Sequence, residues 1–235
     1  YISTEAAVRS GAGLVTLCTK KSILDILKSK LVEAMSMSYE DIAFEGVISN
    51  SDSIAIGPGM GNNELTLKCV KNILSKNGCP VVLDADALNV LKGNLELLKN
   101  SKRKIIITPH MGEMSRLTGV DVESLIENRI GIAVNFAKEY KVIVLLKGYN
   151  TIITDGNEVY VNSTGNSKMA SGGMGDTLTG IIASFIGQGY EPFKATIVSA
   201  YIHGYCGDIL SKEMFCVNAS HVIEKIPYVV EYLVK

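Results

Sequence analysis

A glycine-rich segment that runs directly into an apolar stretch is the part of this sequence best suited to chemistry. Gly172, Gly173 and Gly175 precede the apolar run 180–186, which we expect to form a buried helix. Glycines let the backbone approach a ligand closely, and a helix start offers unpaired N–H groups, so the combination binds phosphate. Asp176 lies in the first turn, where a carboxylate would repel an anion. It therefore either caps the helix or moves a proton beside the phosphate.

Composition and charge exclude several classes of protein. The 235 residues are 47% hydrophobic and 20% charged, with a formal net charge of −1. This predicts a globular chain without general attraction to nucleic acid or to membranes, and no apolar run approaches the ~18–20 residues that span a bilayer. The five cysteines form no C-x-x-C pair, which fits a reducing compartment, so we expect a cytoplasmic protein. The basic run 102–104 is interpreted as a solvated turn.

Short runs rich in Val and Ile alternate with helix-like apolar spacing, and this order predicts an α/β fold with a mostly parallel sheet flanked by helices. The predicted strands are Leu14–Cys18, Ile54–Ile56, Val81–Leu83, Ile105–Ile107 and Val142–Leu146, followed by a hairpin of Thr151–Thr154 and Glu158–Val161. The predicted helices are Glu64–Lys76, Ala87–Leu91, Val122–Tyr140, Gly173–Ile186, Pro192–Leu210 and a short piece near Tyr228–Val234. We expect one domain over residues 1–235, with a helical C-terminal third.

Glycines or polar side chains follow four consecutive predicted strands. These residues are the turn 57–61, the pair Asp84 and Asp86, the pair His110 and Glu113, and finally Lys147. The carboxyl ends of parallel strands meet at one edge of a sheet, where ligands bind. Each residue has a structural alternative: the aspartates and His110 can cap helices, and Glu113 can interact with a helix dipole.

Two further histidines, His203 and His221, are interpreted as structural, and no set of side chains has the spacing of a metal site. No Walker A loop and no G-x-S-x-G elbow occurs.

The G-x-G-D sequence at a helix start resembles the anion hole and catalytic aspartate of the ribokinase-like superfamily. A longer series of motifs resembles one branch of it, the ADP/ATP-dependent NAD(P)H-hydrate dehydratases, over nearly the whole chain. The motifs are R-S-G-A-G-L-V at 9–15, G-P-G-M-G at 57–61, V-L-D-A-D-A-L-N at 82–89, T-P-H-x-G-E-x-x-R-L at 108–117, N-x-T-G-N at 162–166 and G-x-G-D at 173–176.

The resemblance implies a ribokinase-like fold and a role for individual residues. Asp176 would be the catalytic base at the substrate hydroxyl. The remaining substrate contacts would be Gly59, His110, Asp84 and Asn166. The adenine nucleotide, ADP or ATP with Mg²⁺ held through its phosphates, would be bound by Lys147, Gly148, Tyr149, Asn150, Thr151, Gly172, Gly173 and Gly175.

The implied reaction is repair of hydrated NADH or NADPH by phosphorylation of the substrate hydroxyl and elimination. The resemblance also implies a homo-oligomer, with a tetramer as one expected state. Relatives have Pro or His at the position of Met111 and Thr at that of Met174, and they carry an earlier strand with a Gly-rich turn, so we expect that strand to be missing here.

Two other functions remain open from the sequence. A small-molecule kinase of the same superfamily, acting on hydroxyethylthiazole, hydroxymethylpyrimidine or pyridoxal, would use the same Asp176 and anion hole. A non-catalytic nucleotide sensor with this fold would have no use for the aspartate, so the presence of Asp176 argues against a sensor.

Overall fold

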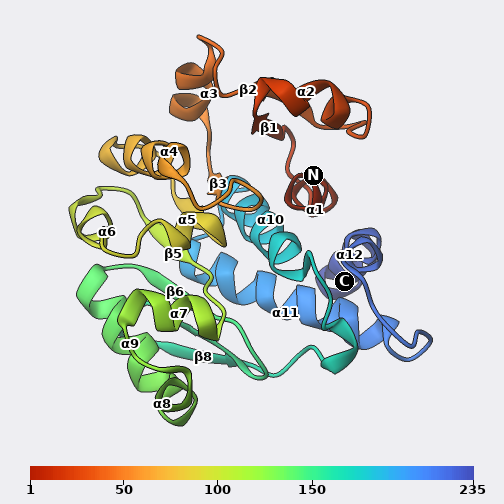
Figure 1. Cartoon of the computed structure of the whole chain (residues 1–235). Helices are drawn as coiled ribbons and strands as arrows, with labels where there is room; N and C mark the ends of the chain where they lie inside the picture. Colours follow the sequence, from red (N-terminus) through yellow and green to blue (C-terminus); the bar gives the residue numbers. More distant parts are fainter.

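A six-stranded sheet forms the centre of the molecule, and its strands lie side by side in chain order (Figure 1). The computed structural model describes residues 1–235. The parallel strands are β3 (Ile54–Ile56), β4 (Val81–Leu83), β5 (Ile105–Ile107) and β6 (Ile143–Leu146), and the antiparallel ones are β7 (Thr151–Thr154) and β8 (Val159–Asn162). A separate parallel pair consists of β1 (Thr16–Thr19) and β2 (Met35–Ser38). The predicted α/β class and mostly parallel sheet are therefore confirmed.

The central strands are apolar at every position because both faces of the sheet are covered. In β4, Val81 and Leu83 pack into the hydrophobic cluster on one face, whereas Val82 packs into the cluster on the other. All three residues are fully buried. The alternation of side chains along a strand thus divides a continuous apolar run between two cores.

Helices cover the two faces as two groups, and the helix that follows Gly173 belongs to the second (Figure 1). The first group is α4 (Glu64–Ser75), α5 (Asp86–Asn89), α6 (Glu96–Asn100), α7 (Met111–Thr118), α8 (Val122–Glu127) and α9 (Arg129–Tyr140). The second group is α1 (Ile2–Arg9), α10 (Met174–Gly187), α11 (Pro192–Leu210) and α12 (Ala219–Val234). The helices α2 (Lys21–Lys28) and α3 (Phe44–Asn50) lie with the β1–β2 pair, and a 3-10 turn spans Ser167–Met169.

Several predicted boundaries were wrong. The helix predicted over Val122–Tyr140 is two helices, because Asn128 leaves the helical conformation and accepts a hydrogen bond from the backbone N–H of Gly131, which caps α9. The first predicted strand begins two residues later, and Leu14 is 85% exposed. The last helix begins at Ala219 rather than near Tyr228 and continues through Pro227.

Candidate active site

The start of α10 has the properties of an anion site. Gly173 precedes the helix with φ of +86°, and no side chain caps this end. The N–H groups of Met174, Gly175 and Asp176 have no hydrogen-bond acceptor, and the first helical bond runs from Thr177 N–H to the Gly173 carbonyl. An uncapped helix start with free N–H groups at its positive end can bind phosphate. The segment Gly172–Gly175, which we call the anion loop, could hold the terminal phosphate of a nucleotide.

Asp176 lies in the first turn of α10, half-buried and without a hydrogen-bond partner. It lines a cavity of about 1030 Å³, and Gly57, Gly59 and Met60 line the same cavity. Burial raises the pKa of Asp176, and the charge of Asp84 raises it further, whereas Lys147 acts in the opposite direction. A carboxylate that is accessible, unpaired and more basic than usual can take a proton from a ligand.

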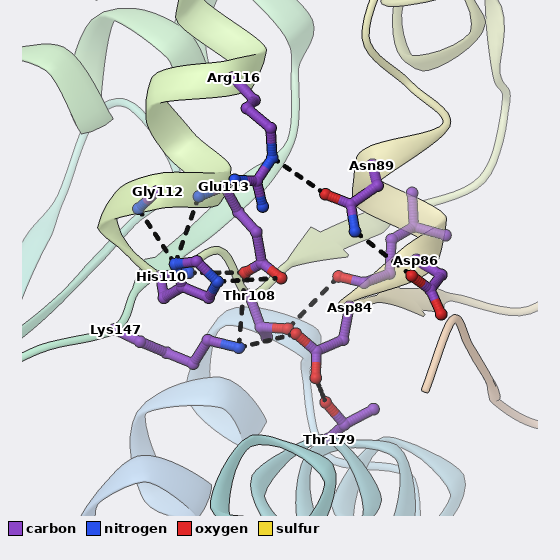
Figure 2. Close-up of polar contacts among 11 residues, drawn as sticks. Asp84, Asp86, Asn89, Thr108, His110, Gly112, Glu113, Arg116, Lys147 and Thr179 are labelled. Atoms are coloured by element: carbon purple, nitrogen blue, oxygen red, sulfur yellow. Dashed lines mark hydrogen bonds and ion pairs between the residues drawn. The ribbon is translucent and has the colours of Figure 1, made fainter. Parts of the chain in front are cut away.

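Asp84, at the end of β4, is the second carboxylate of the site, and it has a contrasting environment. Its side chain is almost fully buried, with Oδ1 2.8 Å from Nζ of Lys147 and Oδ2 accepting a hydrogen bond from the Thr179 hydroxyl at 2.9 Å (Figure 2). Both oxygens are therefore engaged, and Asp84 has no free lone pair directed at solvent. Two neighbouring carboxylates in such different environments have different roles, with Asp84 fixed and Asp176 free to react. The predicted contact of Asp84 with substrate stays a prediction.

His110 begins α7 and both caps it and presents one free nitrogen. Its Nδ1 accepts from the N–H groups of Gly112 and Glu113, and the Glu113 carboxylate accepts from the His110 N–H at 2.8 Å (Figure 2). The imidazole is about half exposed, and its Nε2 lies 3.5 Å from Oε1 of the buried Glu113 carboxylate. The two sequence interpretations, a cap and a ligand contact, are therefore compatible.

Glu113 connects His110 with the centre of the site. Its side chain is 6% exposed and lies 3.8 Å from Nζ of Lys147 through Oε2. It also forms the reciprocal half of the α7 cap. A buried carboxylate requires such partners, so Glu113 does more than interact with the helix dipole.

The segment that follows Lys147 is a turn whose backbone is fixed by hydrogen bonds from Arg129. Arg129 donates hydrogen bonds to the carbonyls of Tyr149 and Asn150 at 2.9 and 2.6 Å, and the Thr151 hydroxyl donates to the Gly148 carbonyl. Tyr149 is 81% exposed. The turn thus keeps its backbone in place and offers a free aromatic ring, which is compatible with the predicted nucleotide contact.

The remaining predicted contacts lie at two ends of the site. Gly59 has φ of +69° and open space around it, at the rim of the cavity that Asp176 lines. Asn166 points elsewhere: its amide nitrogen donates to Asp208 at 2.7 Å and to Ser211, and its oxygen accepts from the Lys168 N–H. The structure gives Asn166 the role of fixing its own loop to α11, and its contact with substrate stays a prediction.

Sequence reasoning missed Thr179, whose hydroxyl fixes Asp84. It lies one helical turn after Gly175 and Asp176, so it shares their face of α10. A hydroxyl one turn after a catalytic candidate, at the edge of an apolar run, is the signal that could have identified it.

No group of three or more metal-ligating side chains is present in the structure. None of the helices combines the length and the hydropathy that crossing a bilayer requires.

Comparisons with known proteins agree with this geometry. A family model described as NAD(P)H-hydrate dehydratase matches residues 1–228. The ADP-dependent (S)-NAD(P)H-hydrate dehydratase of Staphylococcus aureus is 34% identical over 239 residues, which cover 99% of this chain and 83% of that protein. A bifunctional NAD(P)H-hydrate repair enzyme of Moorella thermoacetica is 38% identical over 248 residues, and the chain spans 46% of its length.

One solved structure extends the comparison to the fold. The ADP/ATP-dependent NAD(P)H-hydrate dehydratase of Bacillus subtilis, co-crystallised with ATP and Mg²⁺, has a TM-score of 0.84 and 29% sequence identity, covering 98% of this chain and 83% of that one. The ribokinase-like fold expected from the sequence is thereby confirmed.

Proposed function

We propose that this chain, which belongs to the NAD(P)H-hydrate dehydratase family, restores NADH or NADPH from the hydrated form and consumes ADP or ATP in doing so. The observation that carries the proposal is the contrast between the two carboxylates. Asp84 is buried and paired, whereas Asp176 is unpaired, faces the large cavity and stands at an uncapped helix start. This is the arrangement that a phosphoryl transfer to a substrate hydroxyl requires.

The chemistry assigns one role to each part of the site. Asp176 accepts the proton of the substrate hydroxyl while that oxygen attacks the terminal phosphorus, whose bond to the bridging oxygen breaks, so that AMP or ADP leaves. The free N–H groups of the anion loop and Lys147 stabilise the charge on the transferred group. A Mg²⁺ ion that arrives with the phosphates supplies further neutralisation of that charge.

The phosphorylated intermediate then collapses. The lone pair of the ring nitrogen forms a carbon–nitrogen double bond as the carbon–oxygen bond breaks and phosphate leaves. Loss of a proton from the neighbouring ring carbon restores the reduced nicotinamide. Water has to be kept away from the reactive intermediate during this step. The partial burial of Asp176 supports a site with limited access for water.

A direct assay tests the proposal. Hydrated NADH is incubated with the protein and either ADP or ATP, and the near-ultraviolet absorbance of the reduced nicotinamide is followed together with phosphate release. We expect both signals to appear in equal amounts. Parallel reactions contain ATP with hydroxyethylthiazole, hydroxymethylpyrimidine or pyridoxal. A stable phosphate ester from one of these alcohols, with no recovery of NADH, would favour the kinase alternative.

We also propose a cellular compartment and an oligomeric state for the protein. All five cysteines are free, which supports a reducing compartment and so the cytoplasm. Exposed apolar side chains near the end of α12, including Tyr228, Tyr232 and Val234, support a homo-oligomer. Light scattering on the eluting protein would give its mass, and a monomer at micromolar concentration would contradict the oligomer.

A further inference from the structure

The ion pair of Asp84 and Lys147 lies directly against Gly175 of the anion loop. A Cβ placed on Gly175 would be 3.2 Å from Nζ of Lys147 and 3.6 Å from Oδ2 of Asp84. Nζ is 2.8 Å from Asp84, and the next carboxylate, Glu113, is at 3.8 Å. An ammonium has three donors, so Lys147 can stay bonded to Asp84 and still donate toward a phosphate bound at Gly175.

The position of the Asp84 carboxylate is fixed, because its second oxygen is also hydrogen-bonded. The hydroxyl of Thr179 donates to Asp84 Oδ2, and Thr179 is itself fully buried in α10. The peptide carbonyl of Asp84 also lies against Gly57, where a Cβ would overlap it. The carboxylate is therefore a fixed point to which the flexible lysine is attached.

We propose that Asp84 is a positioning residue, which holds the Lys147 ammonium against the anion loop so that it meets the terminal phosphate of the nucleotide. The inference rests on the proposed function and assigns a role within the same site. In this role Asp84 acts through Lys147.

The charges around Asp176 come from the ends of two strands. Asp84 at the end of β4 raises the pKa of Asp176, while Lys147 at the end of β6 lowers it. Burial acts in the same direction as Asp84 and is the largest cause. Neutralising Asp84 removes one cause of the raised pKa and also leaves the charge of Lys147 uncompensated, so both changes lower the pKa of Asp176.

The inference predicts an unusual separation of binding from turnover. The variant Asp84→Asn removes a negative charge beside a phosphate site, so nucleotide affinity stays within about threefold of the original or increases. Turnover, in contrast, falls by roughly 10-fold or more, because the lysine is misplaced and Asp176 is a weaker base. A site that had merely lost its structure would lose affinity and turnover together.

The experiment uses a cycle of four proteins: the original chain, Asp84→Asn, Lys147→Met and the double variant. Calorimetry measures binding of a non-hydrolysable ATP analogue, and the carboxyl carbon resonance of Asp176 is titrated by NMR. Asp25→Asn on the exposed surface of α2 is the matched control, because its carboxylate is 97% exposed. We expect Lys147→Met to weaken the nucleotide, and Asp84→Asn to lower turnover by a smaller factor in the Lys147→Met background than alone.

The pH dependence completes the test. In Asp84→Asn the titration of Asp176 and the acid limb of the turnover profile both move to lower pH, whereas Asp25→Asn moves neither. An unchanged Asp176 titration, or effects of Asp84→Asn that add fully to those of Lys147→Met, would overturn the inference. Calorimetry and NMR need no turnover, so a protein that binds nucleotide but does not recover NADH would refute the proposed function while still testing Asp84.

Discussion

His110 and Glu113 stabilise one another at the start of α7. Nδ1 of His110 accepts a hydrogen bond from the Glu113 N–H at 3.3 Å, and Oε2 of Glu113 accepts from the His110 N–H at 2.8 Å. This reciprocal cap occupies Nδ1, while Nε2 lies 3.5 Å from Oε1 of Glu113 in an imidazole that is about half exposed. The histidine therefore combines a structural task with a second ring nitrogen that takes no part in the cap, and the two can be separated by substitution.

We expect His110→Asn and His110→Ala to affect stability differently but ligand binding alike. Asparagine can accept the same backbone N–H groups, whereas alanine leaves them unpaired at a cost of about 0.5–2 kcal/mol. Both variants lack Nε2, so both should weaken NADH more than a nucleotide analogue. Thermal melting and separate isotherms for the two ligands measure this. Normal NADH affinity in His110→Asn would show that His110 is only a cap.

Replacing Asp176 by asparagine should abolish turnover without abolishing nucleotide binding. The side chain has no hydrogen-bond partner to lose, and we propose it as the base at the substrate hydroxyl. Loss of a general base lowers rates by roughly 10²–10⁴-fold. Recovery of NADH and calorimetry with an ATP analogue give the two values, and a near-normal rate would mean that Asp176 only closes the helix end.

A methyl group at position 175 should disturb catalysis more than folding. In Gly175→Ala the new Cβ would approach Nζ of Lys147 at 3.2 Å, and the flexible end of the lysine can move by a few tenths of an ångström. We expect a melting temperature within a few degrees of the original, with roughly tenfold slower turnover. Gly46→Ala in α3, where a Cβ meets open space, is the control. Equal activity in the two variants would show that the contact with Lys147 is unimportant.

The protein should lose stability as the pH falls through the region in which histidine normally titrates. Burial lowers the pKa of His203 from its ordinary value of 6.5 to about 4, and its Nε2 has no hydrogen-bond partner. Between about pH 6.5 and pH 4, this histidine is protonated in the unfolded chain but not in the folded chain. The free energy of unfolding therefore decreases as the pH falls through this range. Melting curves of the original chain and of His203→Gln at several pH values should show a shallower decline in the variant, and parallel declines would refute the assignment.

Short-range patterns in the sequence were enough for much of the fold. Three strands, Ile54–Ile56, Val81–Leu83 and Ile105–Ile107, begin and end where the apolar runs predict. Pro192–Leu210 is a single helix as predicted, because its proline occupies the first turn, where no N–H partner is needed. The glycines before Asp176 likewise predicted the anion loop, since backbone approach depends on local residue type.

Several short elements were missed. The helices α1, α2, α3 and α6 and the strand β2 are short and gain their stability from packing, which a single sequence does not reveal. The basic run 102–104 was also misinterpreted in part. Arg103 is 6% exposed and donates to three backbone carbonyls, those of Ile73, Lys76 and Cys79.

The roles of the two aspartates show most clearly what each level of description decides. The sequence by itself established that a carboxylate follows β4 and that another lies in the first turn of α10. Only the tertiary structure decided that Asp84 is the paired one, because its partners Lys147 and Thr179 are 63 and 95 residues away. Burial and ion pairing depend on which strand ends meet when the sheet closes, and those contacts set which carboxylate is paired and fixed and which one is left unpaired.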